Sequence, residues 1–278
     1  MPQSRLAKAV VLAAGAGKRM RRADPTSHLT HDQEHAAAAG HKALMPIGSG
    51  ENGRPFLDFV LSAVADAGCD AVCLVIGEDH NDIQRHYELE RPPARLRVEF
   101  ARQHSPEGTA HALLTAEAFV GRDPFLVLNA DNLYPAAVLG LLMALEGPGL
   151  VAFERDALIR DTGFPLARVA AFALLDVDED GCLRGILEKP GVDRLEVAGP
   201  RALVSMNVWR FDERIFHACR TVARSARGEL ELPEAVGLAI AQGVMFRAVI
   251  GRGAILDLSN RSDVAQVTAE LAGRHATP

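Results

Sequence analysis

The stretch KAVVLAAGAGKRM, residues 8–20, together with HKALMPIG at residues 41–48, decides the fold of this chain. Residues 9–14 form an apolar run that is too short for a helix and ends at glycine, which predicts a buried strand. Gly15 and Gly17 follow at once, and small residues in such a turn let backbone N–H groups close on an anion. The loop is accompanied by cations at Lys18, Arg19, Arg21 and Arg22. The segment therefore predicts a phosphate-binding loop at the end of a buried strand.

Two common glycine motifs do not fit this loop. A dinucleotide-binding turn would have glycine where Met20 stands, and Gly17-Lys18-Arg19 does not complete a P-loop. The pair L-A-A-G-A-G-K-R and H-K-A-L-M-P-I-G instead resembles the signature of the sugar-1-phosphate nucleotidylyltransferases, L-A-A-G-x-G-T-R and P-K-x-L-x-P-[VI]-G. Lys18 and His41 stand where that family usually has Thr and Pro, and the loop between the motifs carries an insertion. Taken alone, the stretch also fits a strand-to-helix turn with solvated cations.

Composition bounds the classes of partner. The formal charge of −6 argues against a nucleic-acid-binding surface, although it does not exclude a local basic pocket. No apolar run approaches the roughly 20 residues that a membrane span needs, and no hydrophobic signal segment is visible at residues 1–8. The four cysteines show no C-x-x-C spacing, which predicts reduced, mostly structural thiols in a cytoplasmic protein. The oligomeric state is left open, with a homo-oligomer among the alternatives.

The order of apolar segments predicts an α/β protein. Strands alternate with helices as far as residue 150, which indicates a parallel sheet wound on both faces. Strands dominate after that, and an Asp178-Glu179-Asp180-Gly181 hairpin turn joins two of them. Besides residues 9–14, strands are predicted at 71–76, 97–100, 125–129, 151–153, 169–177, 183–188, 202–211, 244–250 and 254–258, the last two as a pair. Helices are predicted at 56–68, 79–87, 108–120, 135–145, 212–224, 232–242 and 261–274.

The resemblance implies a Rossmann-like, doubly wound mixed sheet. We expect residues 1–278 to form one domain, with a nucleotide-binding half at about 5–150, a sugar-phosphate-binding half at about 151–260 and a C-terminal helix at 261–274. Residues 21–40 contain Pro25 and several histidines. A metal-binding helix face is one interpretation of those histidines, and a solvated, mobile loop is the favoured one.

Two aspartates follow apolar strand-like segments. Asp131 ends the run Leu126-Val127-Leu128-Asn129-Ala130, and ligands of open α/β sheets bind at the carboxyl ends of strands. A carboxylate there is a natural ligand for Mg²⁺, although it could also cap the next turn. Asp257 lies in a similar setting and looks like the aspartate of the family segment W-x-D-I-G-T-P-E-D. The resemblance implies that both aspartates hold Mg²⁺.

Further segments match family motifs in the same order. Gln103 and Gly108 lie in a loop that resembles Q-x-x-P-x-G-[LT]-A, in which the glutamine and the glycine backbone read the nucleobase. Glu188-Lys189-Pro190 resembles the triplet in which Glu contacts sugar hydroxyls and Lys contacts the sugar phosphate. Residues 206–211 are like N-x-G-[IV]-Y-x-F, with Asn207 a weaker sugar contact, and residues 228–235 are like G-E-[IY]-x-L-T-[DE]-A.

The combined hypothesis is transfer of a nucleotidyl group from a nucleoside triphosphate, UTP or dTTP favoured, to a sugar 1-phosphate. Arg19, Lys42 and Lys189 would be catalytic through charge neutralisation and positioning. The nucleotide would contact Ala13, Ala14, Gly15, Gly17, Gln103, Gly108 and Asn129, and the sugar phosphate would contact Glu188, Lys189 and Asn207. A nucleotidylyltransferase for a cyclitol or choline phosphate, and a non-catalytic nucleotide or sugar-phosphate sensor, are the alternatives.

Overall fold

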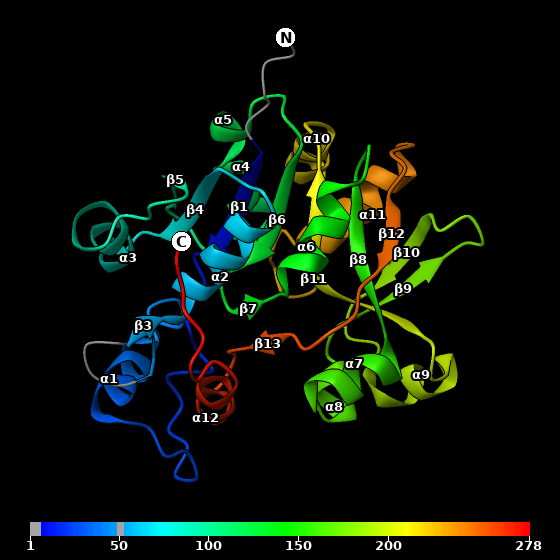
Figure 1. Ribbon diagram of the computed structural model, residues 1–278. Coiled ribbons are helices and arrows are strands. Elements are labelled where there is room, and N and C mark those ends of the chain that lie inside the picture. The colour runs from blue at the N-terminus through cyan, green and yellow to red at the C-terminus, as the bar shows by residue number, and fades with distance from the viewer. Residues whose placement is uncertain (1–6, 49–52) are drawn as a thin grey trace.

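The computed structural model describes residues 7–48 and 53–278, and a nine-stranded mixed sheet lies at its centre (Figure 1). Its parallel part has the order β6-β1-β4-β5; β1, β4 and β6 are largely apolar, whereas β5 alternates polar and apolar residues. Their bounds are β1 Lys8–Ala13, β4 Ala71–Gly77, β5 Arg97–Gln103 and β6 Phe125–Asn129. The strands predicted over these four segments are confirmed.

The rest of the sheet is largely antiparallel and is built around β11. This strand pairs antiparallel with β6, β8 and β9, so it joins the parallel part to the later part of the chain. The predicted hairpin is also confirmed, because the Asp178 N–H donates to the Cys182 carbonyl at 2.9 Å and Gly181 has a φ of 76°. The strands are β8 Gly149–Glu154, β9 Ala173–Val177, β10 Leu183–Leu187, β11 Leu203–Phe211 and β12 Arg247–Ile250.

The strand order reverses at β1. The chain runs outward from β1 to β4 and β5 on one side, then returns to place β6 on the other side of β1. The loops that follow β1 and β6 therefore diverge and leave a crevice between the carboxyl ends of the two strands, which is where open α/β sheets bind ligands.

Helices cover both faces of the sheet (Figure 1). Helices α2 (Phe56–Asp66) and α6 (Ala136–Met143) pack with one core cluster, and α4 (Thr109–Leu114), α10 (Arg214–Thr221) and α11 (Leu232–Ala241) pack with the other. Strand β1 contributes side chains to both clusters, because Ala9 and Val11 belong to the first and Val10 to the second. This alternation is the period-two pattern of a strand that is buried on both sides.

The remaining elements lie outside the main sheet and the helices just named. They are α1 His31–Ala39, α3 Asn81–Arg85, the π-helix η2 His86–Glu90, α5 Glu117–Val120, α7 Arg155–Thr162, α8 Leu166–Val169, α9 Gly191–Ala198, α12 Arg261–Glu270, β2 Pro46–Ile47, β3 Arg54–Pro55, β7 Asn132–Leu133 and β13 Leu256–Asp257.

The prediction of a mobile loop over residues 21–40 is wrong, because much of it is helix α1. Thr30 and Gln33 form a capping box at its start, and Gly40 ends it with a φ of 77°. The apolar periodicity that signals most helices is missing here, since buried Ala37 and Gln33 are its main packed side chains. In the sequence, the residues of the two caps are therefore the features that indicate this helix.

Several other boundaries differ from prediction. Residues 166–169 are helix α8, so β9 begins only at Ala173. The last two strands do not pair with each other: β12 pairs with β8, and β13 pairs with β7. The helix predicted at 108–120 is divided into α4 and α5, and the one at 79–87 continues as η2. Helices α7 and α9 were not predicted.

The structure can be compared with the expectation of reduced, structural thiols and with the absence of a long apolar segment. All four cysteines are buried free thiols, and burial raises the pKa of Cys69, Cys73 and Cys219 to about 12, which makes them poor nucleophiles. Over residues 7–48 and 53–278, helices long and apolar enough to cross a membrane are absent.

Candidate active site

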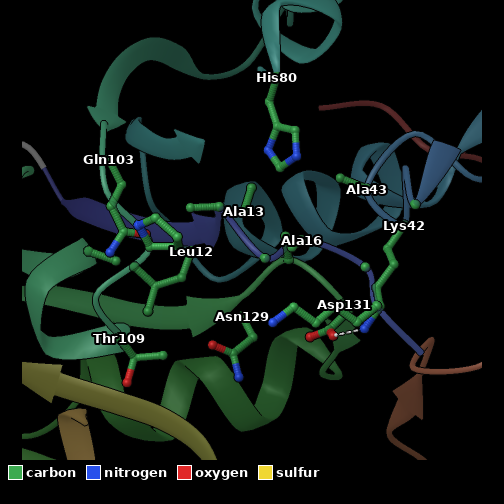
Figure 2. A pocket seen from close by; sticks show the side chains of 18 of the residues that line it. Leu12, Ala13, Ala16, Lys42, Ala43, His80, Gln103, Thr109, Asn129 and Asp131 are labelled. Atoms are coloured by element: carbon green, nitrogen blue, oxygen red, sulfur yellow. Dashed lines mark hydrogen bonds and ion pairs between the residues drawn. The ribbon is translucent and has the colours of Figure 1, made fainter. Parts of the chain in front are cut away.

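A cleft of about 470 Å³ lies at the carboxyl ends of β1 and β6, where the strand order reverses (Figure 2). It is lined by backbone and small side chains from the loop after β1, by Lys42, and by residues from the loops after β5 and β6. The structure brings together the predicted residues Ala13, Ala14, Gly15, Gly17, Arg19, Lys42, Gln103, Gly108, Asn129 and Asp131.

The glycine loop packs directly on the end of the α1 segment. Gly17 has a φ of 61°, and a Cβ on it would lie 2.7 Å from the Cα of Gly40. Arg21 donates from Nε to the Ala39 carbonyl at 3.2 Å, and Arg261 donates from Nε to the Met20 carbonyl at 2.9 Å. These contacts fix the loop that carries Arg19, which is exposed at the edge of the cleft.

Lys42 and Asp131 meet inside the cleft. The Lys42 Nζ donates to Asp131 Oδ2 at 3.0 Å, and both side chains are largely shielded from solvent (Figure 2). Lys42 follows the α1 segment, whereas Asp131 follows β6, so residues far apart in sequence meet at the strand-order reversal. A charge-assisted hydrogen bond of this length holds both groups in place.

Gln103, the last residue of β5, and Gly108, in the loop that follows, form one wall of the cleft. The Gln103 Nε2 group donates to the Gly108 carbonyl at 3.0 Å and lies 3.1 Å from Nδ1 of His111. Gly108 has a φ of 114°, and a Cβ on it would overlap the backbone of Leu230. Its neighbour Glu107 accepts from the Leu230 N–H at 2.7 Å. The loop after β5 is thereby fixed to the segment that precedes α11.

His80 lines the cleft, and the sequence motifs did not point to it (Figure 2). Its Nδ1 accepts from the Gly77 N–H at 3.2 Å, which places a neutral ring at the end of β4. Burial lowers the pKa of His80 below its ordinary value, against an opposing effect of Asp82. The neighbouring His41 lies 2.9 Å from Asp82 through Nδ1, so the residue that replaces the family proline links Lys42 to α3.

Glu188 and Lys189 do not line the main cleft. They lie directly after β10, and burial followed by the like charge of Glu231 raises the pKa of Glu188. The Oε1 atom of Glu188 is buried and has no hydrogen-bond partner among the described residues. Lys189 adopts a φ of 47°, a backbone conformation that is uncommon for residues other than glycine.

The structure corrects the register of the motif around Asn207. Asn207 has a φ of 63°, a conformation that favours glycine. Val208, Trp209 and Phe211 match the last positions of N-x-G-[IV]-Y-x-F, so Asn207 stands at the glycine and Ser205 at the asparagine. The Oδ1 atom of Asn207 is buried and also lacks a partner within the described residues. Its contact with a sugar stays a prediction.

Asp257 lies beside Asp131 but outside the cleft lining. The Leu258 N–H donates to the Asp131 carbonyl at 2.8 Å, so the two segments run next to each other. Burial, and then the charge of Asp131, raise the pKa of Asp257 against the opposing effect of Arg168, which binds its carboxylate. Among the described residues, no group of three or more His, Cys, Asp or Glu side chains is arranged to hold a metal ion.

A glycine loop, a lysine and a carboxylate at the reversal point of a doubly wound sheet define a nucleotide-binding α/β protein. The chain belongs to the nucleotidyl transferase family, whose model matches residues 8–273.

Named relatives share this family and fold. The chain is 29% identical over 256 residues to the UTP–glucose-1-phosphate uridylyltransferase AglF of Haloferax volcanii, covering 92% of this chain and 93% of the relative. It is 27% identical over 268 residues to the glucose-1-phosphate thymidylyltransferase of Streptomyces antibioticus, covering 94% of this chain but only 65% of that relative's length. UDP-glucose pyrophosphorylase complexed with UDP-glucose superposes with a TM-score of 0.72 at 18% identity, over 97% of this chain and 100% of that chain.

Proposed function

We propose that this chain transfers a nucleoside monophosphate from a nucleoside triphosphate to a sugar 1-phosphate, giving a nucleoside diphosphate sugar and pyrophosphate. The observation that carries the proposal is the Lys42–Asp131 pair inside a cleft bounded by the glycine loop. The similarity to uridylyl- and thymidylyltransferases for glucose 1-phosphate supports this reaction and this class of acceptor.

The nucleobase is proposed to be uracil or thymine. The amide nitrogen of Gln103 is already engaged with the Gly108 carbonyl and with His111. Its Oε1 is then the atom left to a ligand, and an amide oxygen accepts a hydrogen bond. The N3–H of uracil or thymine is a donor that suits this acceptor, and the backbone of Gly108 lies beside it in the same wall.

The proposed chemistry is a direct in-line displacement. An oxygen of the sugar phosphate attacks the α-phosphorus of the triphosphate, the bond from that phosphorus to the β-phosphate oxygen breaks, and pyrophosphate leaves with the electron pair. Arg19 and the Gly15–Gly17 backbone hold the triphosphate and the leaving group, and Lys42 neutralises charge near the α-phosphate. Such catalysis is positioning and electrostatic stabilisation, with no protein nucleophile.

Asp131 is suited to a Mg²⁺ ion. It presents a carboxylate to the cleft, and Lys42 contacts only its Oδ2. Mg²⁺ prefers one or two protein carboxylates and takes its other ligands from phosphates and water. When bound, the ion would supply charge neutralisation between the two phosphate-bearing substrates.

The acceptor is proposed to bind in the second half of the chain. Lys189 would orient the attacking phosphate, Glu188 would accept from sugar hydroxyls, and Asn207 would add a further contact. The buried, unpartnered oxygens of Glu188 and Asn207 support this, because such atoms usually pair in the complete complex. We also infer a reducing compartment such as the cytoplasm from the four buried free thiols.

The test is pyrophosphate release with Mg²⁺, glucose 1-phosphate and each common nucleoside triphosphate. We expect release with UTP or dTTP, reduced by a factor of ~10² or more in Asp131→Ala. Asp176→Ala, an exposed aspartate on β9, is the matched control and should keep wild-type turnover. Release with a cyclitol phosphate or phosphocholine alone would reassign the acceptor. Tight nucleotide binding without release for any acceptor would favour a sensor.

A further inference from the structure

Arg168, on the short helix α8, binds two carboxylates beside the proposed metal site. Its guanidinium lies 2.8 Å from Asp257 Oδ2, and its Nη2 also donates to the Asp257 carbonyl at 3.1 Å. The same group donates to both oxygens of Asp263, at 2.7 and 3.1 Å. A side chain with this many charge-assisted contacts has a fixed position.

Both side-chain oxygens of Asp257 are therefore in use. Ser259 donates from Oγ to Oδ1 at 2.7 Å, while Arg168 takes Oδ2. The whole residue is only 7% exposed, and it does not line the cleft. Asp131 differs in both respects, because it lines the cleft and Lys42 contacts one of its oxygens.

Arg168 is not free to withdraw when a cation arrives. Its guanidinium packs 4.4 Å from the centre of the Phe164 ring, and Asp263 is a buried residue whose Oδ2 also accepts from the Ser259 and Asn260 N–H groups. Those bonds form the N-terminal cap of α12. Moving Arg168 away would leave two buried carboxylates without their counter-charge, which is strongly unfavourable.

We propose that Arg168 keeps Asp257 out of metal coordination, so that Asp131 is the one of these two aspartates that ligates the divalent cation. Arg168 and Asp257 are then positioning residues that hold the segment before α12 against β7, and the other ligands of the cation are phosphate and water oxygens. This inference rests on the proposed function only in taking Asp131 as a metal ligand.

The test is direct binding of Mn²⁺ alone to the full chain. The electron paramagnetic resonance signal of the free ion measures how much Mn²⁺ stays unbound. We expect Asp131→Asn to weaken binding about tenfold or more, as loss of a ligand or its support does. Asp257→Asn should stay within about threefold of wild type, because Asn keeps the size of the side chain and Arg168 keeps Asp263 as its partner. A loss in Asp257→Asn equal to that in Asp131→Asn would overturn the proposal.

Substitution of Arg168 by a neutral residue should strengthen Mn²⁺ binding, whereas substitution of Asp131 should weaken it. Arg168→Gln frees Asp257 and should tighten Mn²⁺ binding about tenfold, whereas Arg168→Lys keeps the positive charge and should bind as wild type. A disturbed fold alone would weaken binding, so tighter binding is specific to the proposal. A folded Arg168→Gln variant with unchanged affinity would overturn the role given to Arg168.

Activity is scored separately from metal affinity. Unaltered Mn²⁺ binding in Asp131→Asn would overturn this inference, yet pyrophosphate release by the wild-type chain would still support the proposed reaction. Absence of release by the wild-type chain would count against the proposed function, whatever the Mn²⁺ affinities are.

Discussion

The candidate site residues of the proposed nucleotide half, around the cleft, and of the proposed acceptor half, around Glu188 and Asn207, differ in how completely they are paired. In the cleft, Lys42 pairs with Asp131, and Gln103 with the Gly108 carbonyl. In the acceptor half, Glu188 and Asn207 each bury an oxygen that has no partner in the described part of the chain. The two non-glycine residues with positive φ among the described residues, Lys189 and Asn207, also belong to that half.

This contrast predicts that the two proposed sites bind their ligands in different ways. The candidate residues of the cleft are already held by hydrogen bonds within the chain, so the proposed binding of a triphosphate requires little rearrangement of their loops. Glu188 and Asn207 retain unpaired polar atoms, and Lys189 and Asn207 have positive φ, features that cluster at binding sites because a ligand relieves them. Substitutions in the two halves should consequently have different effects.

The largest effect is expected in the phosphate loop. Arg19→Ala should lower kcat/KM by a factor of ~10² or more, because it removes a preorganised positive charge from the leaving group. Arg22→Ala is the matched control, since Arg22 is exposed on the same loop but does not line the cleft. Steady-state pyrophosphate release measures both. Equal losses in the two variants would show that the loop acts through its net charge and not through Arg19.

The second largest effect is expected on stability, at the contact between Gly108 and the Leu230 backbone. Gly108→Ala should lower the free energy of unfolding by about 3 kcal/mol, from a positive φ and from overlap with the Leu230 backbone. Gly121→Ala isolates the first cause, because Gly121 has a φ of 61° with nothing within 4 Å of the added Cβ, and should cost about 1 kcal/mol. Urea unfolding gives both values. Equal losses would mean that the Leu230 contact is not rigid.

A separation of Michaelis constants would test the acceptor half. Lys189→Ala should raise the KM for the sugar phosphate about tenfold while leaving the KM for the nucleotide within about threefold, because it removes one charge from one phosphate. Arg194→Ala, an exposed residue on α9, serves as control and should change neither constant. An equal rise in both constants for Lys189→Ala would break the division into two halves.

The smallest effect concerns pH and His80. Because burial lowers the pKa of His80, its neutral form stabilises the folded chain above its ordinary pKa, and this contribution is lost as pH falls through the lowered value. Protonation removes the Nδ1 acceptor for the Gly77 N–H. Nucleotide affinity measured by calorimetry should fall about threefold between about pH 7 and about pH 5. In His80→Gln, whose side chain does not titrate, nucleotide affinity should depend less on pH. An unchanged pH dependence in this variant would show that another group causes it.

The sequence predicts the nucleotide half well because its information is local. Apart from Lys42, which follows α1, the candidates there lie at the end of a strand or in the loop after it, and the carboxyl ends of parallel strands meet at one edge. The acceptor half depends on how separate elements approach. The Oδ2 atom of Asp257 is bound by Arg168, which lies on helix α8, an element that was not predicted, and the positive φ of Asn207 supports placing it at the glycine of its motif. His80 carried no motif because its role is a bond to one backbone N–H.

The α1 segment leaves the glycine loop and returns to it at nearly the same point. Arg21 binds the carbonyl of Ala39, and Gly17 touches Gly40, so the two ends of the insertion are neighbours in space. A detour whose ends already meet can be lengthened or shortened without moving Arg19 or Lys42, because loop length adds little to the entropy of closure. The geometry of the glycine loop is therefore independent of the length of the helix that follows it.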